Sequence, residues 1–212
     1  MNNIYVDTHV HLNDETLKKH LDEVIKDAFL NNVKKMFVVG WDLESSKEAL
    51  ELANKYDWCY AIIGFHPCNI KGYGDEEYAW LEQAAKDNRV VAIGEIGYDL
   101  HWDTTTLLEQ SIAFEKQIGI AKRIGKPISI HSRDASQLTM DMIKKTNASI
   151  VGGVLHSYSG SLEMAKEYIK LNFNFGISGP VTFKNGRNVK EVVEGIDLKY
   201  LISETDSPYL TP

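Results

Sequence analysis

Short apolar runs alternate with longer amphipathic segments along the whole chain. Eight of these runs have the length and apolar character of buried strands, and they cover residues 4–6, 36–39, 60–63, 90–93, 127–130, 150–155, 173–177 and 200–202. Such continuous apolar blocks are typical of strands that are buried on both faces of a parallel sheet. The alternation therefore predicts a series of βα units.

The segments between the runs have the period of helices. In residues 17–29, apolar side chains recur every three or four positions opposite a charged face, which predicts one amphipathic helix. Similar stripes occur at residues 108–121, 138–142, 162–169 and 189–193. Eight strands with seven mostly helical crossovers predict an α/β fold of the TIM (β/α)8 barrel type. We expect residues 1–212 to form this single domain, because no linker or low-complexity tract divides them.

The last predicted strand begins at Tyr200, and the sequence reaches only to Pro212. We therefore expect a barrel whose last helix is missing, either because the chain is a fragment or because it is a short form. Uncovered strands expose apolar surface, which is a plausible site of association. The gap thus predicts either self-association or cover by a neighbouring chain.

Composition excludes several classes of protein. The chain has 43% hydrophobic and 25% charged residues, which is ordinary for a globular domain and unlike disordered or membrane-spanning chains. The first residues lack the basic and apolar regions of a secretory signal, so we expect a cytoplasmic protein with no membrane partner. Cys59 and Cys68 match neither a zinc site nor a disulfide framework.

Acidic residues outnumber basic ones by 30 to 23, which gives a net charge of −7. No global basic surface therefore attracts nucleic acid. A substrate that carries phosphate would need local positive charge, and bound metal ions are often the largest charges in a site.

Six metal-ligating side chains lie at or just beyond the ends of predicted strands, where TIM barrels build their active sites. They are His9, His11, Glu95, His131, His156 and Asp206. So many titratable groups on one rim have no ordinary structural reason, whereas two divalent cations would satisfy all of them. Imidazole with carboxylate suits Zn or Mn, while Mg usually prefers oxygen ligands, and the sequence leaves Mg, Mn and Zn open. Glu95, midway in the barrel order, is the natural bridge between two metals.

Six motifs in chain order strengthen this interpretation. They are His9-Val10-His11, Gly64-Phe65-His66-Pro67, Gly94-Glu95-Ile96-Gly97-Tyr98-Asp99, Ile130-His131-Ser132-Arg133-Asp134-Ala135, His156-Ser157-Tyr158-Ser159-Gly160 and Glu204-Thr205-Asp206-Ser207-Pro208. Together they resemble the TatD family of metal-dependent deoxyribonucleases, within the amidohydrolase superfamily. The resemblance runs from end to end of the chain, and it implies a TIM barrel that hydrolyses DNA, typically as a 3′-to-5′ exonuclease.

The resemblance also implies a ligand set. His9, His11, Glu95 and Asp206 would hold one metal, and Glu95 would bridge to a second metal held by His131 and His156. The chain departs from the family pattern at Tyr98, where Leu is usual, and in lacking the C-terminal helix. With two such metals, Asp206 could orient the attacking water or accept its proton, so Asp206 and Glu95 are the candidate catalytic residues.

Four further side chains are candidates for supporting roles. His66 could contact the scissile phosphate or cap a loop, and Arg133 could clamp a phosphate or pair with Asp134. Glu204 shares the face of Asp206 and is expected to hold a ligand imidazole or a metal-bound water. Asp7 shares the face of His9 and is expected to orient it. Asp99 is expected only to lock the loop that follows Glu95 through a hydrogen bond.

Two other functions compete with the hydrolysis of DNA. Related barrels hydrolyse other esters and amides, and an aminoacyl-tRNA deacylase is one example. A truncated, non-catalytic form that binds metal or a partner is the other alternative. Many amidohydrolases bridge their metals with a modified lysine, whereas this chain offers Glu95 and no lysine at that strand end. The sequence thus favours the nuclease alternative without identifying the substrate, and it shows no obligate protein partner.

Overall fold

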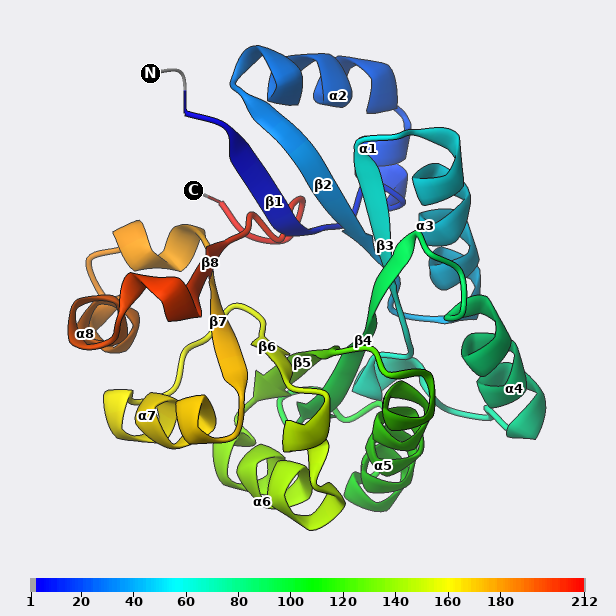
Figure 1. The fold of residues 1–212 in the computed structure, drawn as a ribbon, viewed down its shortest axis with the longest axis vertical. Coiled ribbons are helices and arrows are strands. Elements are labelled where there is room, and N and C mark those ends of the chain that lie inside the picture. Colours follow the sequence, from blue (N-terminus) through cyan, green and yellow to red (C-terminus); the bar gives the residue numbers. More distant parts are fainter. Residues whose placement is uncertain (1–2, 212) are drawn as a thin grey trace.

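The computed structural model describes residues 3–211 and confirms the predicted barrel. Eight parallel strands lie side by side in chain order, as Figure 1 shows. They are β1 (Tyr5–Val10), β2 (Val33–Val39), β3 (Cys59–Ile63), β4 (Val90–Asp99), β5 (Ile128–Arg133), β6 (Gly153–Leu155), β7 (Phe173–Ile177) and β8 (Leu201–Ser203). Their carboxyl ends bring the predicted ligands to one rim.

Helices connect the strands on the outside of the barrel. They are α1 (Glu15–Lys18), α2 (Leu21–Leu30), α3 (Leu43–Lys55), α4 (Asp75–Ala84), α5 (Leu107–Ile124), α6 (Ser136–Thr146), α7 (Leu162–Lys170) and α8 (Arg187–Gly195). As predicted, no helix follows β8 within the described residues. No helix in residues 3–211 is long and apolar enough to cross a membrane.

Several predicted boundaries were wrong, and three of them are described here. The stripe at residues 17–29 forms two helices, α1 and α2, because the chain leaves helical geometry at His20. Residues 150–152 lie before β6 rather than in it, since Gly152 has a left-handed backbone (φ 62°) that a strand does not accommodate. β4 continues four residues beyond Glu95 and ends at Asp99.

The main apolar core lies between the strands and the surrounding helices. Along β2, Met36 and Val38 belong to this outer core, whereas Val39 joins a small separate cluster with Ile62 and Ala92. Because side chains alternate between the two faces of a strand, the small cluster fills the inside of the barrel. The candidate metal ligands lie above this apolar plug, at the mouth.

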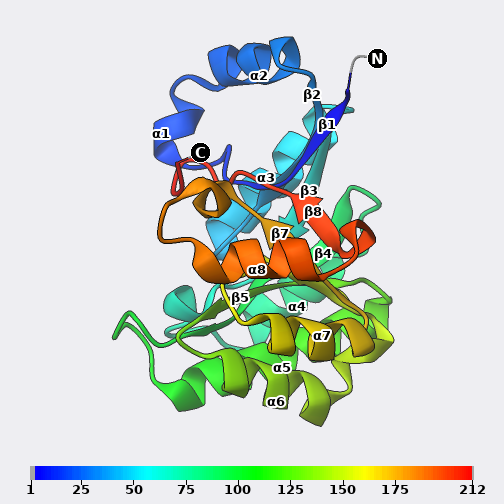
Figure 2. The ribbon, with the colours of Figure 1, turned by 90° about the vertical axis from the view of Figure 1, so that its left-hand side faces the viewer.

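The ring is nearly closed, and the junction at which β1 faces β8 is called the seam. Side chains connect the two strands, since Thr8 Oγ1 donates to the carbonyl of Ser203 at 2.9 Å and Ser203 Oγ donates to that of Val6 at 3.0 Å. Beyond β8, the backbone N–H of Asp206 donates to the His9 carbonyl at 2.8 Å. The C-terminal segment therefore lies along the end of β1 (Figures 1 and 2).

The outer surface beside the seam exposes apolar side chains. Ile4 is 70% exposed and Leu198 is 79% exposed. Exposed apolar patches mark association surfaces in many proteins. Self-association through this surface stays a prediction.

Gly97 of β4 allows close packing beneath the candidate ligand His131, and its replacement by Ala is expected to destabilise the fold. A Cβ atom there would lie 2.0 Å from the His131 carbonyl oxygen, and the backbone φ of 144° disfavours any side chain. Overpacking and backbone strain each cost about 1–3 kcal/mol, so we expect the free energy of unfolding to fall by about 2–5 kcal/mol. Urea denaturation measures this change.

Gly119→Ala is the matched control for this substitution. Gly119 lies inside α5, where a Cβ would meet only a flexible arginine side chain at 3.4 Å. Replacing an interior helical glycine with alanine is expected to stabilise by roughly 0.5–1 kcal/mol. Equal midpoints for the two variants would contradict the packing account of Gly97.

Candidate metal centre

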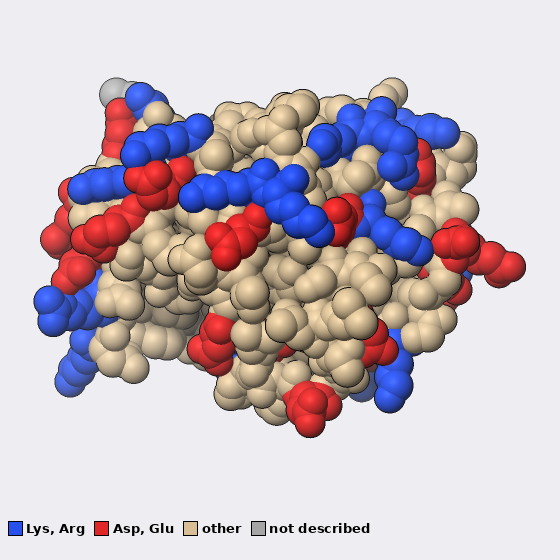
Figure 3. All heavy atoms as spheres, turned by 90° about the horizontal axis from the view of Figure 1, so that it is seen from below, with Lys and Arg blue, Asp and Glu red and all other residues tan. Residues whose placement is uncertain are grey.

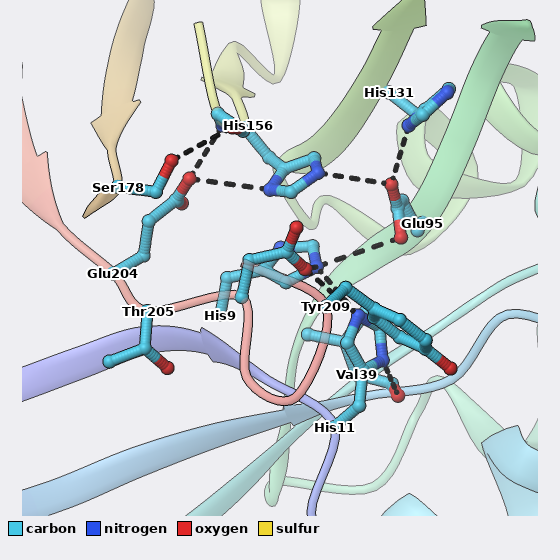
Figure 4. A network of polar contacts seen from close by, with 12 residues as sticks. His9, His11, Val39, Glu95, His131, His156, Ser178, Glu204, Thr205 and Tyr209 are labelled. Carbon is cyan, nitrogen blue, oxygen red and sulfur yellow. Dashed lines mark hydrogen bonds and ion pairs between the residues drawn. The ribbon is translucent and has the colours of Figure 1, made fainter. Parts of the chain in front are cut away.

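Nitrogen and oxygen atoms from the two ends of the chain converge at the mouth of the barrel (Figure 4). The Nε2 atoms of His9 and His11 lie 3.3 Å apart, and the Oδ1 atom of Asp206 lies 3.7 Å from the first and 3.3 Å from the second. Ligands that are each about 2.0–2.2 Å from one metal lie roughly 3–3.6 Å from one another. The three side chains therefore have the spacing of a metal site.

Glu95 connects this group to a second one. Its Oε2 atom lies 3.6 Å from His9 Nε2, while Oε1 lies 3.2 Å from His156 Nε2 and 2.9 Å from His131 Nδ1. Burial alone would raise the pKa of Glu95, but the charge of His156 and the hydrogen bonds from the histidines hold that pKa well below its usual range. The carboxylate is therefore ionised, and each of its oxygens faces a different set of imidazoles.

The protonation of His9 and His11 suits metal binding. His11 Nδ1 lies 3.1 Å from the carbonyl oxygen of Val39, which can only accept, so the proton sits on Nδ1 and the Nε2 lone pair faces the group. Burial, followed by the charge of His156, lowers the pKa of His9. Neutral imidazole is the form that binds metals.

Glu204 lies beside the imidazole of His156, one of the candidate ligands. Its Oε1 atom is 3.3 Å from His156 Nδ1, at ion-pair distance but without hydrogen-bond alignment. The same oxygen accepts the backbone N–H of Ser157. Although burial opposes it, the charges of Glu95 and Glu204 raise the pKa of His156 well above its usual value. His156 thus lies between two carboxylates, as Figure 4 shows.

Asp7 does not contact the imidazole of His9, contrary to the prediction. Its Oδ1 atom accepts the backbone N–H groups of His9 at 3.2 Å and Thr205 at 3.0 Å, and Oδ2 accepts the Thr205 hydroxyl at 2.6 Å. Burial raises the pKa of Asp7 to about 6, against the hydrogen bonds from Thr205. Asp7 therefore fixes the segment that carries Asp206. The backbone of Asp206 is left-handed (φ 57°), and this segment must hold it in that conformation.

Asp99 has a larger part in the site than the sequence indicated. Its Oδ1 atom accepts the backbone N–H groups of His101 and Trp102, as a loop lock should, but Oδ2 also lies 2.8 Å from His131 Nε2. Burial opposes ionisation, yet these hydrogen bonds lower the pKa of Asp99 to about 2. Because β4 continues past Glu95, Asp99 lies four residues on and on the same face.

His66 and Arg133 lie at the edge of the centre. His66 Nδ1 accepts the backbone N–H of Cys68 at 3.2 Å, which is the capping role that the sequence left open. Burial lowers the pKa of His66 to about 4, so the neutral ring carries its proton on Nε2. The Arg133 guanidinium lies 5.7 Å from the ring centre of Trp102. Within residues 3–211, Arg133 makes no ion pair, and Asp134 lies instead near His101.

Two aromatic residues beside the centre were missed by sequence reasoning. Trp41 and Tyr209 both pack edge-on against His11, at ring-centre distances of 5.2 and 5.0 Å. The Tyr209 hydroxyl donates to Asp14 at 2.9 Å. No local pattern marks either residue, because the strands that bring them to His11 are distant in sequence.

The sequence matches the protein family described as TatD related DNase over residues 6–212. The chain belongs to the TatD family. It is 43% identical over 206 residues to the uncharacterized metal-dependent hydrolase YabD of Bacillus subtilis, a match that covers 97% of this chain and 81% of YabD. It is 32% identical to the 3'-5' ssDNA/RNA exonuclease TatD of Salmonella typhimurium, over 97% of this chain and 80% of that protein.

A solved TatD structure has the same fold. The crystal structure of YJJV, a TatD homologue from Escherichia coli K12, superposes with a TM-score of 0.91 at 29% sequence identity. The match covers 99% of this chain and 81% of YJJV. The chain is therefore a metal-dependent hydrolase of the TatD family with a TIM-barrel fold.

Proposed function

We propose that the protein is a 3′-to-5′ exodeoxyribonuclease that uses two divalent metal ions. The observation that carries this proposal is the geometry of Glu95, whose two oxygens face two separate sets of imidazole nitrogens. A carboxylate placed in this way suits a two-metal site, and two metals suit the in-line displacement at a phosphodiester. The 3'-5' exonuclease activity for which the Salmonella relative is named supports the same reaction.

The donor atoms of His9, His11 and Asp206 lie close enough together to share one ion, and so do those of His9, Glu95 and His156. His9, His11, Glu95 and Asp206 would hold one ion, and Glu95, His131 and His156 would hold the other. When bound, such ions supply charge stabilisation and lower the pKa of water. Burial opposes the ionisation of Asp206, but hydrogen bonding from His11 and the charge of His156 lower its pKa. Asp206 is therefore ionised at neutral pH and can orient the attacking water and accept its proton.

The remaining residues hold the substrate and the ligands. His66 offers an Nε2–H group that can donate to a phosphate oxygen, and Arg133 offers a guanidinium with no acidic partner among the described residues. Glu204 fixes the ring of His156. The surface is not uniformly basic, since Figure 3 shows acidic side chains among the lysines and arginines of the face near α6. In this proposal, the bound metal ions and Arg133 supply positive charge next to the substrate.

Digestion of labelled single-stranded DNA tests the proposed function. Metal-stripped protein is resupplied with Mg, Mn or Zn and given DNA labelled at either end. Release of mononucleotides from the 3′ end, dependent on metal and abolished by EDTA, is the expected result. Absence of cleavage with every metal, by folded and metal-loaded protein, would contradict it and shift the assignment to another ester or amide.

Replacing Asp99 with Asn is expected to lower nuclease activity about 10- to 100-fold. The amide keeps an oxygen for the loop backbone but loses the charge that faces His131 Nε2 at 2.8 Å. Losses of this size are typical of residues that orient metal ligands. Steady-state kinetics and metal content are the measurements. Asp103→Asn, in the same loop and exposed, is the matched control, and equal activity of both variants would refute this role.

A further inference from the structure

A cavity of about 560 Å³ opens directly beside the metal centre. His131, His156 and Asp206 line one end of it, and the loops that follow β5, β6 and β7 form its walls. This volume lies within the range of about 300–1,000 Å³ that is typical of sites for small molecules. A molecule in the cavity would therefore place one of its bonds at the candidate metal ligands.

The walls of the cavity differ in chemistry. The segment after β7 contributes the apolar surfaces of Pro180, Phe183 and Val189, together with the exposed amides of Asn185 and Asn188. The walls after β5 and β6 contribute serine hydroxyls and the guanidinium of Arg133. Asp206 is the acidic residue that lines the cavity. One side therefore suits a flat apolar group with polar edges, and the other suits a sugar and an anion.

Phe183 is held in place by its backbone. Its N–H donates to the Pro180 carbonyl at 3.0 Å, and its own carbonyl accepts the backbone N–H of Gly186 at 3.1 Å and the ammonium group of Lys190. A Cβ atom at Gly186 would lie 2.4 Å from the Pro180 oxygen, so the turn is tight. The half-buried ring of Phe183 is thus presented by a preorganised segment, which reduces the cost of ordering it on binding.

We propose that this cavity binds the 3′-terminal nucleotide of a single strand, with its base stacked on Phe183. The inference rests on the proposed function and adds the element that recognises the substrate. A nucleotide combines a flat base, a polar sugar and an anionic phosphate, and each part meets a complementary wall. Asparagine amides both donate and accept, so Asn185 and Asn188 can pair with the edge of any base. A base in this position is unpaired, and a duplex end must therefore open before it is cut.

Binding of a modified oligonucleotide tests the inference separately from catalysis. The probe is a 5′-fluorescein single strand whose last linkage is a methylphosphonate, which carries no charge and resists hydrolysis, so metal-free protein in EDTA can be used. One version ends in an ordinary 3′ nucleotide, and the other ends in an abasic residue. Fluorescence anisotropy gives both affinities. Because stacking of a base on an aromatic ring is substantial, we expect the ordinary end to bind about 10-fold more tightly.

Three variants of Phe183 and its neighbour make the test decisive. Phe183→Leu keeps apolar bulk but loses the flat face, and it should bind both probes equally. Phe183→Tyr keeps the ring and should keep the preference. Lys184→Ala, an exposed neighbour that does not line the cavity, should behave as the unmodified protein.

Equal binding of both probes by the unmodified protein would overturn the inference, as would an intact preference in Phe183→Leu. The proposed function is decided apart from this, by metal-dependent hydrolysis of the natural strand. Hydrolysis without a terminal-base preference would leave the nuclease standing and remove the subsite. A base preference without hydrolysis would leave the subsite standing and remove the nuclease.

Discussion

Replacing Glu95 with Gln is expected to lower metal-dependent DNA hydrolysis by about 100-fold or more. Both oxygens of Glu95 face imidazole nitrogens, at 3.6 Å for His9, 3.2 Å for His156 and 2.9 Å for His131. The amide of Gln offers one oxygen and a donor in place of the second, so it cannot serve both groups. Losing a residue that merely orients a metal ligand lowers activity or metal affinity about 10- to 100-fold. Losing a bridging ligand should lower activity at least as much.

The measurement for this variant is kcat/KM on 3′-labelled single-stranded DNA, together with the metal bound per chain. Glu51→Gln, an exposed site on α3, makes the same chemical change away from the centre and should be active. An unfolding midpoint near that of the unmodified protein would show that the loss is local. Activity above half of the normal value in Glu95→Gln would refute the bridging role.

Adding Mn or Zn to metal-stripped protein is expected to raise the Tm by about 5–10 °C. A ligand that binds only the folded state at 100 times its Kd stabilises by about 2.7 kcal/mol. In a domain of this size, 1 kcal/mol shifts the Tm by roughly 2–4 °C. The donor atoms come from β1, β4, β5, the end of β6 and the segment after β8, so unfolding any of these regions breaks the site. Differential scanning calorimetry measures the shift.

His9→Asn and His20→Asn form the matched pair for this measurement. His9 faces both His11 and Glu95, so its loss should remove most of the metal-induced shift. His20 is exposed at the start of α2 and should leave the shift intact. An undiminished shift in His9→Asn would show that the metal binds elsewhere.

The architecture could be predicted from local sequence patterns. Buried strands of a parallel barrel need continuous apolar runs, and the order of runs and stripes determines the order of strands and helices. The same patterns failed where a helix or strand begins or ends although the spacing of the apolar residues continues. Leu17 and Leu21 are four residues apart, so the stripe continues across His20 although the helix does not. Ile150 is apolar but 65% exposed, because β6 starts only at Gly153.

The clustering of the candidate ligands could be predicted because the barrel brings strand ends together, but their hydrogen-bond partners could not. The contact of Asp7 depends on Thr205, which is 198 positions away in sequence. The contact of Asp99 depends on the length of β4, which the apolar run at residues 90–93 does not reveal. Hydrogen-bond partners come from segments that lie opposite one another in the fold. No local sequence pattern indicates which segments these are.

The candidate ligands on the two sides of the seam between β1 and β8 are also translated at different times. His9 and His11 leave the ribosome early, whereas Asp206 is translated nearly two hundred residues later. At about 5–20 residues per second, the first ligands wait roughly 10–40 s for their partner. During that interval the nascent chain cannot assemble the full donor set. The proposed donor set is therefore complete only after Asp206 has been translated and the end of β8 has met β1.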